Sequence, residues 1–214
     1  MSKPFSWEQF NDMPIVGILR KLPAHKLEKI VSLYQQCGLT TLEITMNTEG
    51  AAEMIQQLND AYPNLNVGAG TVCNQKDLDV ALRAGASFIV TPITDEKLIA
   101  RCKESNVPVF PGAFTPSEIY KAWSAGAEVV KLFPAGLLGP KYIKDVLAPL
   151  DQIKLMPVGG VDLQNFTEFL QAGAVGLGLG SQLFLKEAIE NEAWEQLESH
   201  FKAFVDKYRA YRGS

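Results

Sequence analysis

Histidine and cysteine are scarce in this chain of 214 residues, which holds 2 histidines and 3 cysteines. His25 and His200 lie far apart with no metal-ligand spacing, so we expect no metal site, and zinc-dependent chemistry is disfavoured. The cysteines are odd in number and form no CxxC pair (Cys37, Cys73, Cys102). We therefore expect free thiols in a reducing compartment rather than a disulfide framework.

Long apolar runs and a surplus of basic residues are also missing. No run approaches the roughly 20 apolar residues needed to cross a bilayer, and the first residues contain no signal-peptide core. The 20 lysines and arginines are outnumbered by 24 acidic residues, which disfavours nucleic acid as a partner. The short basic cluster from Arg20 to Lys26 is interpreted as a solvated helix start. We expect a cytoplasmic protein without a membrane or nucleic-acid partner.

Short apolar runs instead alternate with longer helix-periodic segments along almost the whole chain. The runs predict strands over 14–19, 40–46, 65–70, 87–92, 107–112, 128–133, 153–160 and 174–180. Eight such β–α units favour an α/β fold: a single (β/α)8 TIM barrel over 1–214 with little decoration. A doubly wound open sheet is the alternative.

Lys131 is the most unusual residue of the pattern, because it interrupts the apolar run Val129–Phe133. A buried ammonium is costly unless it is paired or loses its proton. Glu43 lies inside the second predicted strand and would point into the same barrel. A neutral lysine can form a Schiff base with a ketone, and a nearby carboxylate can move protons. The competing interpretation is a structural ion pair.

Glycine clusters end the seventh and eighth predicted strands, in "PVGGV" and "GLGLGSQLF". Free backbone N–H groups at a helix start bind anions, and barrels often hold phosphate after these two strands. We expect a phosphate site here, with the second cluster opening a helix. Thr71 and Arg20 follow the third and first strands, at the same mouth. Arg20 is available for a carboxylate or phosphate, and the alternative is a surface charge.

A set of phrases carries a family resemblance: "ILR", "LEIT", "GAGTV", "IVTP", "FPG", "VVKLFP", "GPKYIK", "VGGV" and "GLGS". In this order and spacing, the chain resembles the class I aldolases of the 2-keto-3-deoxy-6-phosphogluconate (KDPG) aldolase family. The resemblance implies a compact homotrimeric barrel that needs no metal or organic cofactor. It also implies cleavage of a phosphorylated keto acid, KDPG, to pyruvate and glyceraldehyde 3-phosphate.

The resemblance further assigns roles to individual residues. It makes Lys131 the Schiff-base lysine and Glu43 the acid/base. The pyruvate part of the substrate would contact a set of residues around them: Thr71, Arg20, Asn47, Pro92 and Phe133. The phosphate would be held by Gly159, Gly160, Gly180 and Ser181.

Two positions depart from the gluconate pattern and resemble the enzymes that act on the galactonate epimer. Asn47 stands where the gluconate enzymes carry an arginine, and Val158 stands where some carry threonine. The carboxylate contact is then expected to pass to Arg20. The gluconate substrate is placed first, with its galactonate epimer and 4-hydroxy-2-oxoglutarate as alternatives. A phosphosugar isomerase or epimerase and a non-catalytic phosphate-binding barrel remain as rivals of another class.

Overall fold

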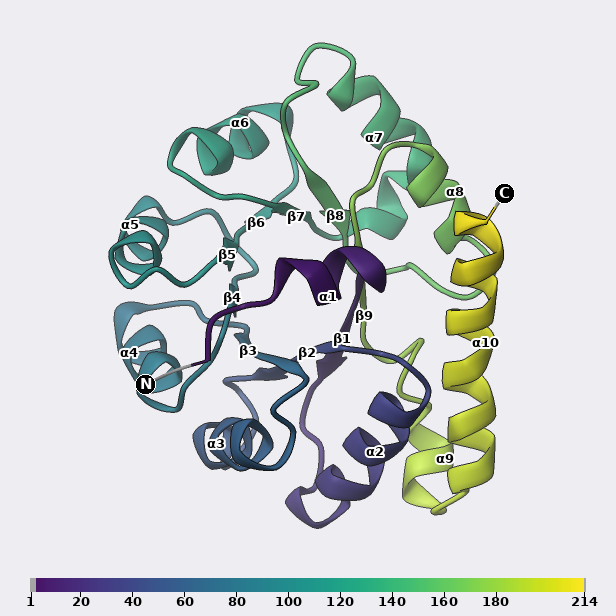
Figure 1. Ribbon diagram of the computed structural model, residues 1–214. Helices are drawn as coiled ribbons and strands as arrows, with labels where there is room; N and C mark the ends of the chain where they lie inside the picture. The colour runs from purple at the N-terminus through teal and green to yellow at the C-terminus, as the bar shows by residue number, and fades with distance from the viewer. Residues whose placement is uncertain (1–2, 214) are drawn as a thin grey trace.

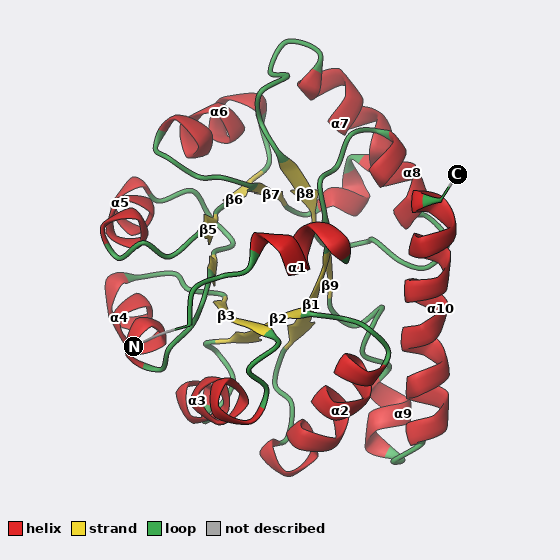
Figure 2. Ribbon diagram, viewed as in Figure 1, coloured by secondary structure: helices red, strands yellow, loops and turns green. Residues whose placement is uncertain are grey.

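The computed structural model describes residues 3–213, over which parallel strands alternate with helices. The strands are β1 (Ile15–Leu19), β2 (Thr41–Thr45), β3 (Asn66–Gly70), β4 (Ile89–Val90), β5 (Val109–Phe110), β6 (Gly112–Ala113), β7 (Val130–Leu132), β8 (Leu155–Pro157) and β9 (Leu177–Leu179). The helices are α1 (Trp7–Asp12), α2 (Ala24–Gln36), α3 (Ala51–Ala61), α4 (Gln75–Arg83), α5 (Glu96–Glu104), α6 (Pro116–Ser124), the 3-10 turn η1 (Ala135–Leu137), α7 (Gly139–Leu147), α8 (Phe166–Gln171), α9 (Lys186–Glu190) and α10 (Trp194–Arg212). The strands lie together in the middle of the molecule and the longer helices surround them (Figures 1 and 2).

The strands form two curled parallel sheets. One has the order β5-β4-β3-β2-β1-β9 and the other the order β6-β7-β8. A single parallel bridge between Val158 and Gly178 joins the second sheet to β9 of the first. The α/β class and the parallel alternation predicted from the sequence are confirmed.

The fifth predicted strand is divided, and Pro111 gives the reason. Proline has no N–H to donate to a ladder, so regular pairing stops there and β5 and β6 lie on either side of it. The carbonyl of Pro111 still accepts from the N–H of Lys131 at 2.9 Å. Gly112 is needed at this point because a Cβ there would lie 2.4 Å from the backbone of Pro92.

Aromatic side chains fill one end of the space that the strands enclose. Helix α1 crosses this end (Figure 1). Phe10 of this helix and Phe5 just before it pack on Phe88 and Phe110, with ring centroids 5.2–5.9 Å apart. These rings belong to an inner apolar cluster that is separate from the larger core between the sheets and the outer helices. Because α1 precedes β1, it covers the amino ends of the strands, and the carboxyl ends remain for a site.

Local sequence signals account for the outer helices. Thr115 and Glu118 form a capping box at the start of α6. Helices α4, α6 and α8 all end in Ala–Gly, and each glycine has a positive φ that a C-terminal cap requires (Gly85, Gly126, Gly173). Helix α10 packs outside as an amphipathic helix through Phe201 and Phe204. Within residues 3–213, none of the helices combines the length and the apolarity that crossing a membrane would need.

Candidate active site

Glu43 and Lys131 both point to the inner side of the two curled sheets, which are together called the strand ring below and whose inner side carries the inner apolar cluster. Glu43 on β2 is paired in register with Ile18, and Lys131 on β7 is paired with Met156. Ile18 and Met156 belong to the inner cluster, and laterally paired residues share a face of a sheet. Glu43 is 1% exposed and Lys131 4% exposed. The ring therefore holds one acid and one base that are both almost completely removed from water.

Burial controls the protonation of Glu43. Desolvation raises the pKa of its carboxyl to about 7, and the positive charges of Lys131 and Arg20 offset part of that rise. The Oε2 atom is buried and has no hydrogen-bond partner. A carboxyl with a pKa near neutrality and an unused oxygen can both accept and return a proton.

The pKa of Lys131 is shifted as well, in the opposite direction. Burial lowers the pKa of its ammonium, the negative charge of Glu43 raises it, and Arg20 lowers it again. Among residues 3–213 its Nζ forms no hydrogen bond or ion pair, and it lies 4.8 Å from the centre of the Phe133 ring. A structural ion pair would hold Lys131 and Glu43 in direct contact, so this arrangement favours a reactive amine.

Thr71 directly follows β3 and has a left-handed backbone, with φ at +56°. Branched residues rarely adopt this conformation, and such strain is concentrated at functional sites. Pro92 follows β4 and lies against Gly112, while Asn47 is exposed in the turn after β2. The charge of Arg20 acts on both Glu43 and Lys131. Within residues 3–213, no hydrogen bond or ion pair joins the side chains of Glu43 and Lys131 to Asn47 or Pro92.

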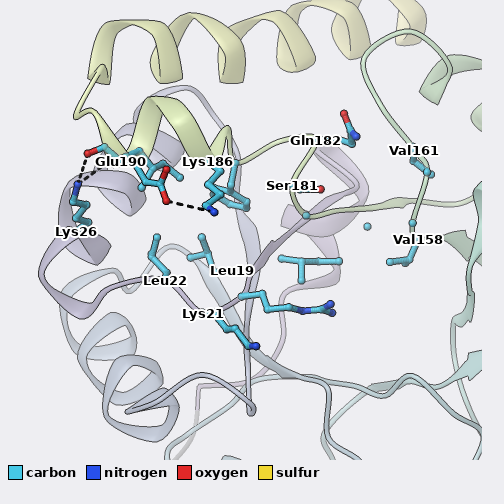
Figure 3. Close-up of a pocket in the computed structure, with 18 of the residues that line it drawn as sticks. Leu19, Lys21, Leu22, Lys26, Val158, Val161, Ser181, Gln182, Lys186 and Glu190 are labelled. Atoms are coloured by element: carbon cyan, nitrogen blue, oxygen red, sulfur yellow. Dashed lines mark hydrogen bonds and ion pairs between the residues drawn. The ribbon is translucent and has the colours of Figure 1, made fainter.

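A cavity of about 620 Å³ is lined by residues that follow the carboxyl ends of β1, β8 and β9, some of which are labelled in Figure 3. Six of the residues predicted for substrate binding line it: Arg20, Phe133, Gly159, Gly160, Gly180 and Ser181. Phe133 is the link to the inner pair, because it contacts Lys131 and would also lie 3.4 Å from a Cβ on Gly159. Lys131, Glu43, Thr71, Asn47 and Pro92 are not among the lining residues.

The predicted phosphate glycines form two loops whose amide groups are available. Among the described residues, the N–H groups of Gly159, Gly160, Gly180 and Ser181 make no hydrogen bond. Their carbonyls are used instead: Gly159 accepts from the N–H of Gly136 at 2.7 Å, and Gly180 accepts from Phe184 at 2.9 Å. Free N–H groups that line a cavity are suited to an anion.

The expectation that the second glycine cluster opens a helix is wrong. Residues 181–183 form a turn, and α9 begins only at Lys186. The N–H groups of Leu183 and Phe184 both donate back to Gly180, which closes the turn before a helix can start. The anion site therefore consists of a turn and a glycine loop.

Three lysines of the cavity were missed in the sequence. Lys21, Lys26 and Lys186 line it, and Figure 3 shows Lys26 and Lys186 on either side of Glu190. Lys26 donates to the carbonyls of Ile189 and Glu190 at 2.8 and 3.0 Å. The cluster from Arg20 to Lys26 was the available signal, but it was interpreted as a solvated helix start. Within residues 3–213, no group of three His, Cys, Asp or Glu side chains is arranged to hold a metal ion.

Curated relatives match this chain over most of its length. It is 35% identical over 176 residues to the 2-dehydro-3-deoxy-phosphogluconate aldolase of Pseudomonas aeruginosa, covering 82% of this chain and 80% of that protein. It is 33% identical over 199 residues to the 2-dehydro-3-deoxy-6-phosphogalactonate aldolase of Escherichia coli K12, covering 92% and 95%. Relatives of both substrate types thus match at similar identity.

Solved structures agree with these sequence matches. A native KDPGal structure superposes with a TM-score of 0.89 at 31% identity, covering 99% of this chain and 100% of that one. The KDPG aldolase of Legionella pneumophila, with pyruvate captured as a covalent carbinolamine, superposes with a TM-score of 0.85 at 26% sequence identity. The match covers 92% of this chain and 96% of that one. A chain of a porous protein cage designed by fusing symmetric oligomeric domains superposes with a TM-score of 0.87 at 32% sequence identity. The match covers 94% of this chain and 74% of that one.

The family model for KDPG and KHG aldolases matches residues 8–200. That range contains Glu43, Lys131 and both glycine loops. The resemblance noted in the sequence is confirmed: the chain belongs to the KDPG and KHG aldolase family.

Proposed function

We propose that this protein is a class I aldolase that cleaves KDPG to pyruvate and glyceraldehyde 3-phosphate. The observation that carries the proposal is the buried Lys131, whose amine has no hydrogen-bond or ion-pair partner among residues 3–213 and which shares the inner side of the sheets with the buried carboxyl of Glu43. The aldolase names of the relatives support the same reaction. The two curated relatives reported above are named as aldolases, which favours this reaction over the alternatives of an isomerase or a non-catalytic phosphate-binding protein.

The proposed reaction begins at the neutral amine of Lys131. It attacks the C2 ketone, forms a carbinolamine and loses water to give an iminium. The Glu43 carboxylate then takes the proton of the C4 hydroxyl, the C3–C4 bond breaks, and the bonding pair moves into an enamine while the aldehyde leaves. Glu43 returns its proton to C3, and water hydrolyses the iminium to release pyruvate and free Lys131. The carbinolamine captured in the Legionella enzyme supports this route.

Substrate recognition is proposed to divide between the two ends of the cavity. The amides of Gly159, Gly160, Gly180 and Ser181 bind the phosphate, which they can do because none of them has a partner within the described chain. Arg20 binds the carboxylate, supported by its charge acting on both members of the inner pair.

The smaller contacts of the pyruvate part complete this proposal. Thr71 is proposed to hold the carboxylate with Arg20, and its strained backbone supports a functional role. Phe133 and Pro92 would border the methylene side of the keto acid. Asn47 takes the position of the arginine found in the gluconate enzymes and is proposed as a weaker, polar contact.

The galactonate epimer is the second candidate substrate. Val158 lines the cavity next to the phosphate glycines, and Asn47 lies in the turn after β2. Both residues resemble the galactonate enzymes, and a galactonate aldolase is among the relatives. Values of kcat/KM for the two phosphorylated epimers and for 4-hydroxy-2-oxoglutarate, measured side by side, rank the three substrates directly.

We also propose that the two sheets close into one (β/α)8 barrel. The bridge between Val158 and Gly178 supports closure where β8 meets β9. The hydrogen bond from the Lys131 N–H to the Pro111 carbonyl supports closure where β5 and β6 meet. Counting β5 and β6 as one strand interrupted at Pro111 gives the eight strands that this barrel requires.

A homotrimer in the cytoplasm is the proposed state of the protein. Large apolar side chains remain exposed near the carboxyl ends of the strands: Ile93, Phe114, Tyr120 and Leu137, exposed by 37–80%. A contact between copies would bury such surface, and a relative serves as a symmetric oligomeric domain in a designed cage. Free thiols at Cys37, Cys73 and Cys102 support a reducing compartment.

Turnover tests the proposed reaction. The purified protein is mixed with KDPG, and pyruvate release is followed. We expect the natural protein to release pyruvate steadily and Lys131→Ala to release almost none. Circular dichroism checks that both proteins are folded. Ordinary turnover by Lys131→Ala would refute the mechanism.

A further inference from the structure

Helix α10 contacts both glycine loops of the cavity, although it lies outside the ring. The β9 turn (residues 180–185) is reached by His200, whose Nε2 lies 2.8 Å from the carbonyl oxygen of Gln182. The β8 loop (residues 159–165) is reached by Lys207, whose Nζ donates to Leu163 at 2.6 Å and to Gln164 at 3.3 Å. Figure 1 shows α10 running along the outside of α8 and α9, the helices that follow these loops.

His200 and Lys207 lie on one face of α10. They are seven positions apart in the sequence, which is about two helical turns. Aromatic rings fix their direction: His200 packs against Phe204 at 5.2 Å, Phe204 stacks on Phe166 at 5.7 Å, and the Lys207 ammonium lies 5.2 Å from the Phe166 centre. Both side chains are half-buried. They are therefore held in place by packing as well as by hydrogen bonds.

Each of these bonds occupies a carbonyl close to the free amides. Gln182 directly follows Ser181, and its carbonyl accepts from the imidazole of His200. In the β8 loop, Asn165 donates to the carbonyl of Gly160 at 2.9 Å, and Lys207 holds the two carbonyls just before Asn165. These bonds hold the backbone of the β9 turn and of the β8 loop, the two segments that carry the free amides of Gly180, Ser181, Gly159 and Gly160.

We infer that His200 and Lys207 are positioning residues for the phosphate site, acting through the β9 turn and the β8 loop. This inference rests on the proposed function, because it assigns the two loops to the phosphate of the substrate. Neither side chain lines the cavity. Their effect is to hold the anion-binding amides in place before the phosphate arrives, which lowers the ordering cost of binding.

The test separates phosphate binding from the chemistry at Lys131. The variants are His200→Ala, Lys207→Met and the double variant. His200→Gln and Lys207→Arg keep a donor and serve as rescue variants. Lys202→Ala is the matched control, because Lys202 belongs to the same helix but is exposed and pairs only with Glu198 there. Each protein is assayed for KM and kcat with KDPG, and for exchange of the pyruvate methyl protons with solvent, which needs no phosphate.

We expect the double variant to raise KM about tenfold, because loops that are no longer held in place must be ordered when the phosphate binds. Its kcat and its pyruvate exchange should stay within about twofold of the natural protein, and the rescue variants should recover most of the affinity. A KM no higher than that of Lys202→Ala would overturn the inference. So would an equal loss of pyruvate exchange, which indicates a general structural role.

Binding of inorganic phosphate, followed by 31P NMR, keeps the inference separate from the proposed reaction. If the natural protein does not cleave KDPG, the proposed function fails. The affinities of the variants for inorganic phosphate can still be compared with one another. Weaker phosphate binding by the double variant than by Lys202→Ala then supports the positioning role. Equal binding by the two refutes it.

Discussion

Glu43 occupies the space that a side chain at Gly70 would need. A Cβ on Gly70 would lie 2.1 Å from Oε1 of Glu43 and 2.5 Å from its carboxyl carbon. The two residues lie on neighbouring strands, β2 and β3, which are paired in parallel. The glycine therefore leaves room on the inner face of the ring for the one carboxyl that the proposed reaction uses.

Replacing Gly70 with alanine should displace the Glu43 carboxyl. Because misplacing a catalytic group by about 1 Å can cost about 100-fold in rate, we expect kcat to fall by at least about tenfold. Stability should fall by about 1–3 kcal/mol from overpacking. Steady-state kinetics and urea unfolding measure the two effects.

The control for this variant is the same change in a Glu43→Ala background. With the carboxyl gone, the new methyl group has space, so Gly70→Ala should cause no further loss of rate there. A full additional loss in that background would show that Gly70 acts independently of Glu43.

Glu43→Gln should remove proton transfer while keeping the shape of the side chain. We expect kcat for KDPG cleavage to fall by about 10²–10⁴-fold, the usual contribution of a positioned acid/base. Trapping of pyruvate on Lys131 should survive in part, because the amine remains. A kcat within threefold of the natural value would remove Glu43 from the mechanism.

The raised pKa of Glu43 also predicts a pH dependence of stability. The folded carboxyl has a pKa of about 7 against an ordinary value of 4.5, so between these values the folded state binds a proton that the unfolded state has lost. The contribution of Glu43 to the free energy of unfolding is therefore present below about 4.5 and is lost as the pH rises to about 7.

Comparing the natural protein with Glu43→Gln isolates this contribution, because the amide does not titrate. Urea unfolding at several pH values should show the natural protein losing stability relative to the variant between pH 4.5 and 7. A constant difference across this range would mean that the folded pKa is not raised.

Arg20 should bind the carboxylate of the substrate, because Asn47 stands at the position where the gluconate enzymes resembled by this chain have an arginine. A lost hydrogen bond to a charged group costs about 1.5–3 kcal/mol, so Arg20→Gln should raise KM about 10–100-fold. Lys29→Gln, an exposed cation on α2, is the control for removal of one charge. If Asn47→Ala raises KM more than Arg20→Gln does, the carboxylate is bound at position 47 instead.

The sequence predicts the strands and the inner pair because both depend on local patterns. Lys131 stands out within an apolar run, and Glu43 shares parity with Thr41 and Thr45, which are all buried. The break of the strand at Pro111 could also have been predicted, because proline has no N–H group to donate to a neighbouring strand. It was missed because the apolar run continues through it.

Other features depend on contacts between distant segments. The turn after Gly180 closes through bonds from Leu183 and Phe184, which compete with a helix start in a way that composition does not reveal. The bond between His200 and Gln182 joins residues from the last helix and a strand end. Histidine in an amphipathic helix carries no local sign of such a partner.

Trapping with borohydride tests the central claim most directly. The protein is mixed with pyruvate, reduced with borohydride and digested, and the modified peptide is mapped by mass spectrometry. An iminium is reduced to a stable amine, so we predict a pyruvate-derived adduct on Lys131 and none in Lys131→Ala. A folded protein that gives no adduct, or an adduct only on another lysine, would contradict the account.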